Sequence, residues 1–327
     1  MSAYVPSELW VVAVLAAAFL IVLLVGYTIG RSLPAGIARA LSWTTLVLGT
    51  LGVERLVVAD EPAGVRMVAL ITFALLVMKV IVVIEEGARG MGPLSFGAWL
   101  GFTGAWLGMK PRLFSSAETG SLNGAGTLLR RGTVHVIVGA ALVVLARVAW
   151  TSAHSRLLAT ILLLPGLSFL VHFGLCNLLA GAWRLRGVAC EALFRAPLRS
   201  QNLGEFWARR WNLAFSEMTA IAVYRPLADR LGRGPALMAG FALSGLLHEM
   251  AISVPVRAGF GLPLLYFLVH GGLVLVERSL SRAGHPLSGW AGRAWAIFWV
   301  AAPLPILFHR PFLAGVIWPL IGIPPNG

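Results

Sequence analysis

The adjacent residues His248 and Glu249 are the first candidates for a chemical site. They lie within an apolar stretch, residues 235–254, of a chain that is 58% hydrophobic. An ionisable pair in hydrocarbon is costly and is seldom kept without a partner or a function. A neutral imidazole can accept a proton as a general base, and desolvation favours that neutral form. Ser244 lies one turn before His248 on the same helical face, whereas Glu249 points about 100° away and is expected to tune or anchor this helix rather than to attack a substrate. Both are candidates for the lining of a substrate site.

A second dense group of polar residues lies at 201–217, between two apolar stretches. Its composition is typical of an interfacial helix, because tryptophan and arginine are favoured at headgroup depth. Asn212 stands where the chain turns apolar again and offers both donors and an acceptor to a buried partner. The candidate site residues of this segment are Trp207, Arg209, Arg210, Trp211 and Asn212.

The elements that must position these residues are transmembrane helices. Only 12% of the 327 residues are charged, and apolar runs of spanning length recur along the chain. This pattern predicts an all-α, polytopic membrane protein with about eight spans, within a range of seven to ten. The first run reaches about Tyr27 and is too long for a cleaved signal, so we expect it to be retained. The other spans are expected near 41–58, 66–84, 133–150, 157–183, 235–254, 260–278 and 291–308, with shorter apolar pieces near 94–108, 213–224 and 311–323.

The polar segments are too short to form a separate soluble domain. The two longest, 109–132 and 184–212, are expected to be loops, so residues 1–327 form one membrane-embedded domain. The formal net charge is +13, and the arginines cluster in short loops rather than in one stripe. Membrane orientation and anionic headgroups explain this distribution better than nucleic acid does. The positive-inside rule places in the cytoplasm the loops that carry Arg31, Arg39, Lys110, Arg112, Arg130, Arg131, the run from Arg184 to Arg210, Arg278, Arg282 and Arg293.

The depth of His248 in the membrane follows from the expected start of its helix. Pro235 follows Gly234 and suits a first helical position. His248 then lies about 20 Å along the helix, at 1.5 Å per residue, well inside a hydrocarbon core about 30 Å thick.

One local repeat stands out, because residues 97–101 and 104–108 both read Gly-Ala-Trp-Leu-Gly. On a single helix the four glycines would share one face, and Trp99 and Trp106 another. Close helix packing with interfacial tryptophans is one interpretation, and a smooth groove for an alkyl chain is the other.

The remaining chemically capable residues favour no second site. His172 and Cys176 are four residues apart but lack a third ligand nearby, so no metal is expected. Cys176 and Cys190 have no metal-ligand spacing, and a disulfide between them cannot be assumed. Four other histidines are expected at helix ends: His135, His154, His285 and His309.

Several of these pieces together resemble the wax synthase branch of the membrane-bound O-acyltransferase superfamily. The resemblance covers about residues 196–278, and it is the combined spacing of the pieces that makes it specific. Leu107–Phe114 is a second, weaker match. The matching pieces are Glu205–Leu213, Val223–Pro226, Leu243–Glu249 and His270–Gly272 with Glu277.

The resemblance implies acyl transfer from a thioester to a hydroxyl within the membrane. The essential histidine of the superfamily falls on His248 and its loop asparagine on Asn212. Acyl-CoA is then a co-substrate and a lipid alcohol the acceptor, with no cofactor; acyl carrier protein is an alternative donor. His270 matches a family position and is expected to line the same cavity or to pack between helices. Arg209 and Arg210 are expected to meet either the CoA phosphates or lipid headgroups.

The sequence leaves several alternatives open. A related O-acetyltransferase would act on a polysaccharide or small molecule, whereas a bis-histidine haem protein could use His135, His172, His248 and His270. A transporter or structural membrane protein is a third class. The acceptor, the acyl chain length and the oligomeric state are not encoded in any motif. The arginine-rich, lysine-poor composition indicates a GC-rich bacterial genome and hence a cytoplasmic (inner) membrane location.

Overall fold

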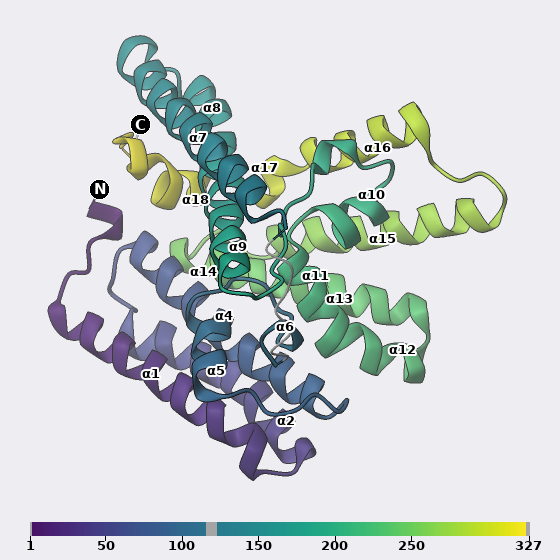
Figure 1. The fold of residues 1–327 in the computed structure, drawn as a ribbon. Coiled ribbons are helices and arrows are strands. Elements are labelled where there is room, and N and C mark those ends of the chain that lie inside the picture. The colour runs from purple at the N-terminus through teal and green to yellow at the C-terminus, as the bar shows by residue number, and fades with distance from the viewer. Residues whose placement is uncertain (1, 116–122, 325–327) are drawn as a thin grey trace.

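The computed structural model describes residues 2–115 and 123–324, and within these ranges the chain is helical with no strand. Figure 1 shows the helices gathered around the segment 190–220, with both described ends of the chain on the same side. The all-α prediction is therefore confirmed, and eight helices of the described chain are long and apolar enough to cross a membrane. Their bounds are Leu9–Ser32, Ala35–Val57, Ala63–Gly87, Ala125–Ala153, Arg156–Leu185, Arg233–Val256, Leu262–Arg282 and Gly289–Leu307.

In the labels of Figure 1, four of these spans are single helices and four are interrupted. The single ones are α1 (Leu9–Ser32), α4 (Ala63–Gly87), α7 (Ala125–Ala153) and α15 (Leu262–Arg282). The others are built from α2 (Ala35–Thr44) with α3 (Thr50–Gly52), α8 (Arg156–Ser168) with α9 (Cys176–Leu185), α13 (Arg233–His248) with α14 (Val254–Val256), and α16 (Gly289–Ala301) with α17 (Leu304–Leu307). Short π-helical turns join the pieces in the first three of these spans.

Two helices begin earlier than the sequence predicts. α13 starts at Arg233 rather than Pro235, after Gly232 at a φ of 85°. His248 is thus about 22 Å along the helix, still well inside the hydrocarbon thickness. α7 starts at Ala125, so the expected loop 109–132 is shorter, and part of it lies outside the described residues.

The pair formed by α7 and the 156–185 helix projects from the rest of the molecule (Figure 1). Its seam on α7 consists of small buried residues spaced seven apart: Ala125, Gly132, Gly139 and Ala146. A Cβ atom added at Gly139 would lie 2.8 Å from the carbonyl oxygen of Gly166. Small residues at this seam let the two backbones approach closely, which is how helices associate in lipid.

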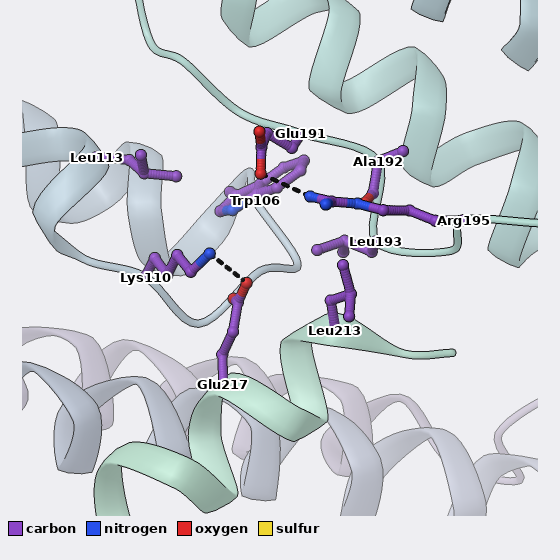
Figure 2. A pocket seen from close by; sticks show the side chains of 9 residues that line it. All are labelled: Trp106, Lys110, Leu113, Glu191, Ala192, Leu193, Arg195, Leu213 and Glu217. Atoms are coloured by element: carbon purple, nitrogen blue, oxygen red, sulfur yellow. Dashed lines mark hydrogen bonds and ion pairs between the residues drawn. The ribbon is translucent and has the colours of Figure 1, made fainter. Parts of the chain in front are cut away.

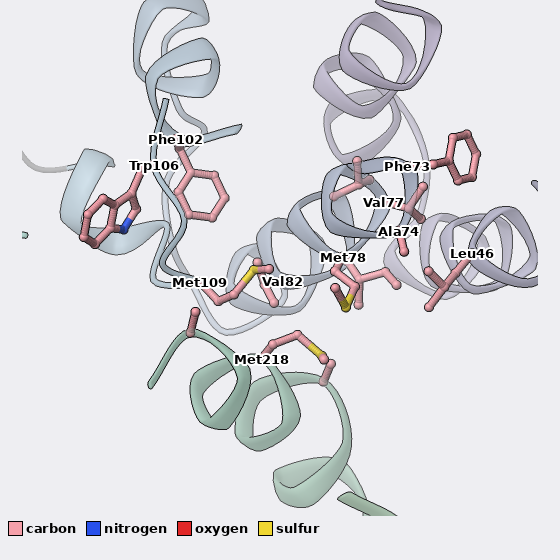
Figure 3. Close-up of a cluster of buried hydrophobic side chains, with 14 of the residues drawn as sticks. Leu46, Phe73, Ala74, Val77, Met78, Val82, Phe102, Trp106, Met109 and Met218 are labelled. Carbon is pink, nitrogen blue, oxygen red and sulfur yellow. The ribbon is translucent and has the colours of Figure 1, made fainter. Parts of the chain in front are cut away.

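The Gly-Ala-Trp-Leu-Gly repeat is not one helix, so that prediction is wrong. Only the first copy is helical, as α5 (Phe96–Gly104), and the second lies in the following loop. The two tryptophans are buried at 1% and 2% exposure rather than interfacial. Figure 3 shows Trp106 with Phe102, Met109 and Met218 in the main hydrophobic cluster. The loop is stable away from a helix because the buried Lys79 of α4 donates hydrogen bonds to its carbonyls at Trp106 and Gly108.

The segment 201–217 is likewise not a single interfacial helix. It contains α10 (Leu203–Glu205), a π-helical turn and then α11 (Leu213–Thr219). The chain turns at Asn212, whose φ is 44°. Asparagine is one of the few residues that adopt this left-handed conformation readily. Asn212 therefore marks a bend in the backbone.

The ends of several elements meet at the C-terminal end of α4. There Glu85 and Glu86 are buried and bind arginines from neighbouring elements. The partners are Arg39 of α2, Arg89 in the turn just after α4, Arg112 of α6 (Arg112–Ser115) and Arg225 of α12 (Arg225–Leu231). This cluster joins the N-terminal helices to the segment that precedes α13. The last short helices, α18 (Arg310–Phe312) and the turns to Ile321, form the apolar piece expected near 311–323.

Candidate active site

His248 is the last residue of α13, and its imidazole is held by its own helix. Nδ1 lies 2.7 Å from the carbonyl oxygen of Ser244. Because a carbonyl only accepts hydrogen bonds, Nδ1 carries the proton of the neutral ring and Nε2 carries the lone pair. The Ser244 hydroxyl donates to the carbonyl of Gly240 at 3.0 Å, the usual bond of a helix serine. The arrangement leaves Nε2 of His248 as a proton acceptor.

Aromatic rings surround this imidazole. The Phe267 ring centroid is 4.2 Å and the Phe215 centroid 5.6 Å from that of His248. α13 packs closely on α15 here, since a Cβ atom at Gly245 would lie 2.7 Å from the Leu264 side chain. The local environment is therefore apolar, which favours a neutral base.

Asn212 caps the start of α11 and is linked to His248 through Phe215. Its Oδ1 accepts a hydrogen bond from the Phe215 backbone N–H at 3.3 Å. The Phe215 ring in turn packs on His248. The imidazole N–H is held by the Ser244 carbonyl and not by Asn212. Its amide nitrogen is the group able to donate to an approaching oxygen.

Trp207 and His270 share a second aromatic group next to the first. The Trp207 ring lies 5.4 Å from both Phe267 and His270, and 6.1 Å from Phe241. Nε2 of His270 donates to the Trp299 carbonyl at 2.8 Å. Phe267 touches both His248 and Trp207, so the structure brings these two predicted residues against one α15 phenylalanine.

Glu249 holds the start of a neighbouring helix. Its Oε1 accepts a hydrogen bond from the Leu264 backbone N–H at 3.0 Å, in the first turn of α15. Such a carboxylate satisfies an N–H that has no partner within its own helix. Glu249 thereby connects α13 to the start of α15 rather than facing the imidazole.

The neighbouring arginines differ in their surroundings. Arg209 is exposed, whereas Arg210 forms an ion pair with Glu205 at 2.6 Å and donates to the Arg195 carbonyl. Burial raises the pKa of the Glu205 carboxyl, but the Gln201 N–H and the Arg210 guanidinium outweigh it and hold that pKa below its usual value. Arg210 thus stabilises the loop, and Arg209 is the more accessible of the two.

Trp211 stabilises the same loop by stacking. Its ring is nearly parallel to Phe206, with centroids 5.6 Å apart, and contacts Phe194 at 5.0 Å. His172 stacks on Phe194 at 4.6 Å and also contacts Trp211, with centroids 5.5 Å apart. Both Trp211 and His172 therefore belong to an aromatic cluster that supports the bend at Asn212.

Glu277 of α15 fixes the start of this segment, a role that the sequence does not reveal. Its buried carboxylate accepts bonds from the backbone N–H groups of Leu203 and Gly204 at 2.7 and 2.8 Å. The Trp295 indole donates to it at 2.9 Å. One carboxylate therefore joins α10, α15 and α16, and fixes where the following residues, Trp207 among them, lie.

Lys79 is the residue that sequence reasoning missed, although a lone lysine in the apolar span 66–84 is a visible signal. It is fully buried in α4. Its Nζ donates to the carbonyls of Phe102 and Trp106 at 3.0 and 2.9 Å, and also to Gly108. The ammonium therefore satisfies carbonyls at the end of α5 and in the loop after it.

A small pocket opens between this loop and α11 (Figure 2). Its lining brings the segment 107–114, which weakly resembles the same family, against the loop 190–195 and Leu213. Lys110 and Glu217 form an ion pair across it at 3.0 Å, and Arg195 pairs with Glu191 at 2.6 Å. Each cation has an acidic partner, so the pocket is not a ready site for an anion.

The other candidates are structural. No group of three or more metal-binding side chains occurs among the residues that the structure describes. Cys176 and Cys190 are free and buried. His154 ends α7 and His309 precedes α18, as predicted, but His135 lies ten residues inside α7, so the prediction for His135 is wrong.

Comparison with known proteins finds matches to the same part of the chain. Residues 190–269 match the model of the membrane bound O-acyl transferase family. A long-chain-alcohol O-fatty-acyltransferase of Simmondsia chinensis is 30% identical over 99 residues, 28% of each chain. Probable long-chain-alcohol O-fatty-acyltransferase 2 of Arabidopsis thaliana is 34% identical over 107 residues, 30% of this chain and 31% of its own.

These matches confirm the resemblance that the motifs indicate. The matched region holds His248, Asn212, Trp207 and Glu249, and it carries the pattern of the wax synthase-like acyltransferases. The chain spans about 30% of the length of these relatives.

Proposed function

We propose that this chain is a multipass membrane O-acyltransferase that moves a fatty acyl group from acyl-CoA to a lipid alcohol. The family match at 190–269 is the starting point. The observation that carries the proposal is the hydrogen bond from His248 Nδ1 to the Ser244 carbonyl, which leaves a basic Nε2 inside a membrane span. The relatives are named for acyl transfer to long-chain alcohols, which is the chemistry proposed for this chain.

The proposed reaction needs no covalent enzyme intermediate. Nε2 of His248 accepts the hydroxyl proton as the alcohol oxygen attacks the thioester carbonyl carbon. The tetrahedral intermediate then collapses, the carbon–sulfur bond breaks, and the imidazolium returns the proton to the departing CoA thiolate. The products are an ester and CoA, and the base is restored to its neutral form.

Asn212 is proposed to donate its amide N–H to the developing oxyanion. Its Oδ1 caps α11, so the amide nitrogen remains for this role. A fixed donor at an oxyanion in a dry site contributes a few kcal/mol to the rate. Removal of this donor is therefore expected to lower turnover.

Acyl-CoA is proposed to approach from the side that carries Arg209. Under an alternating arrangement of the eight spans, the loops 88–124, 186–232 and 283–288 share that side, and they hold much of the basic charge. The positive-inside rule makes it cytoplasmic. The proposed location is the bacterial cytoplasmic membrane, a choice that rests on composition, since the named relatives are from plants.

The proposal is tested by ester formation in membranes that carry the protein. Palmitoyl-CoA is supplied with hexadecanol, diacylglycerol or a sterol, and the product is measured. His248→Asn is the informative variant, because its amide can still donate to the Ser244 carbonyl while the base at Nε2 is lost. We expect a loss of about 10²- to 10⁴-fold, the usual contribution of a general base. Asn212→Ala should lower kcat strongly.

His135→Asn is the matched control, since this histidine lies in another span, where its ring packs on Phe169 and Phe173 and its Nδ1 is 3.4 Å from the Phe173 carbonyl. It should retain activity. Full activity in His248→Asn would refute the mechanism. No ester with any acceptor, from folded protein, would favour a short-chain acyl donor or a non-lipid acceptor.

A further inference from the structure

Two buried nitrogens beside the proposed reaction site have no hydrogen-bond partner. They are Nε1 of Trp207 and Nδ1 of His270. Their rings are in contact, with centroids 5.4 Å apart. His270 is fully buried. A buried polar atom without a partner is costly, and such atoms in a native protein call for an explanation.

The hydrogen-bonding character of both atoms is fixed by their surroundings. An indole nitrogen only donates. His270 Nε2 faces the Trp299 carbonyl and so carries the ring proton. A buried imidazole in a membrane span is neutral unless an acid pairs with it, so His270 Nδ1 is an acceptor. The site therefore presents one donor and one acceptor.

The side chains around the pair cannot satisfy these atoms. Trp207 is surrounded by Phe206, Phe241 and Phe267, which have no polar atoms. The Tyr266 ring touches His270 at 4.2 Å, but its hydroxyl donates to the Val300 carbonyl at 3.3 Å. The complementary group must come from outside the protein.

We propose that Trp207 Nε1 and His270 Nδ1 bind a single hydroxyl group, that of the acceptor alcohol. A hydroxyl oxygen accepts from the indole N–H, and the hydroxyl hydrogen is donated to Nδ1. Each bond would be about 2.8–2.9 Å long, a span compatible with two rings in contact. A thioester or ester carbonyl would satisfy only Trp207, and an alkyl chain neither atom. This matching selects a hydroxyl over the other polar groups of the proposed reaction.

The position of the pair gives the site its role. Phe267 lies between Trp207 and His248, in ring contact with both. A hydroxyl at Trp207 and His270 is thus one aromatic ring away from the proposed base. The alcohol binds there with its alkyl chain in the membrane. Its hydroxyl group reaches Nε2 of His248 when it moves past the Phe267 ring. The identification of the bound hydroxyl as that of the acceptor alcohol rests on the proposed function. The pairing of one hydrogen-bond donor with one hydrogen-bond acceptor does not depend on that function.

The test measures binding without an acyl donor, so that it does not depend on catalysis. Protein in lipid nanodiscs is heated with hexadecanol, hexadecyl methyl ether or hexadecane, and the midpoint of unfolding is recorded. The ether can accept from Trp207 but cannot donate to His270. We expect the largest rise with hexadecanol, a smaller rise with the ether and the smallest with the alkane.

Two variants separate the two bonds. Trp207→Phe keeps an aromatic ring but removes the donor, so hexadecanol should lose most of its advantage over hexadecane. His270→Gln keeps an amide N–H for the Trp299 carbonyl while removing the acceptor at Nδ1, so alcohol and ether should become equal. Phe241→Leu is the control, because it changes the packing against Trp207 without removing a polar atom. It should keep the preference for alcohol.

The outcomes distinguish this site from the proposed activity. An equal rise with alcohol and alkane in the unmodified protein would refute the site, even if esters are formed. A preference for alcohol that survives in both Trp207→Phe and His270→Gln would also refute it. A preference that both variants remove, in a protein that forms no ester, would support the hydroxyl site and reject the acyltransferase proposal.

Discussion

Replacement of Glu277 by glutamine tests whether one buried carboxylate holds the loop 203–212 against α15. The carboxylate is 7% exposed and accepts three hydrogen bonds, two from the backbone of α10 and one from Trp295. In Glu277→Gln the amide oxygen can still serve Leu203 and Trp295. The amide nitrogen would then face the Gly204 N–H, and one buried donor would lose its partner.

The expected cost follows from these bonds. A hydrogen bond to a charged group contributes about 1.5–3 kcal/mol, and an unsatisfied buried donor costs about 1–3 kcal/mol. Glu277→Gln should therefore destabilise the protein by about 2–4 kcal/mol. Glu277→Ala leaves all three donors without an acceptor and should cost about 3–6 kcal/mol. Proteins are commonly stable by only about 5–15 kcal/mol, so both changes should be measurable.

The assay is thermal unfolding in nanodiscs, with ester formation measured in parallel at a temperature where each variant is folded. The alanine variant should unfold at the lowest temperature and the glutamine variant at an intermediate one. Glu191→Gln is the control, because its carboxylate is 54% exposed and its pair with Arg195 is of the surface kind that contributes little. If Glu277→Gln unfolds at the same temperature as the unmodified protein, the carboxylate does not hold the loop.

Two further predictions concern buried groups near the same loops. Lys79→Met keeps the length of the side chain but leaves the carbonyls of Phe102, Trp106 and Gly108 without their donor, so it should destabilise the protein by about 3–5 kcal/mol. An unchanged midpoint of unfolding would show that other donors satisfy this loop. Burial raises the pKa of the Cys190 thiol to about 12, against the nearby positive charges of Lys79 and Arg184. In a Cys176→Ala background a maleimide at pH 8 should thus label the protein only after denaturation, because the thiolate is the reactive form; rapid labelling of folded protein would contradict the burial.

Much of the fold was open to prediction from the sequence. All eight spans appear near their expected positions, because a chain in lipid must satisfy its backbone within helices and cover them with apolar side chains. Local patterning therefore determines where helices lie. The same reasoning identified His248 as a polar residue deep in a span, and the combined motifs identified the family to which the segment 190–269 is similar.

Element ends and breaks were predicted less well. The second Gly-Ala-Trp-Leu-Gly copy has the same sequence as the first but is not helical, because Lys79 from another helix binds its carbonyls. The 201–217 segment breaks at Asn212, and Glu277 and the Arg210–Glu205 pair hold the part of the chain that precedes this bend. Neither a sequence repeat nor a local helix propensity shows which side chains from distant parts of the chain will bind the backbone.

The sequence by itself determined the membrane class, the spans and the residues capable of chemistry, since these depend on side-chain type and on spacing along one helix. The tertiary structure decided which nitrogen of His270 carries the proton, which carboxylates anchor helices and which buried atoms lack a partner. Those properties depend on groups that approach from distant parts of the chain: Glu277 lies 74 residues from Leu203, and Trp299 lies 29 residues from His270. Hydrogen bonding is directional and short in range, so these roles exist only once the helices have packed.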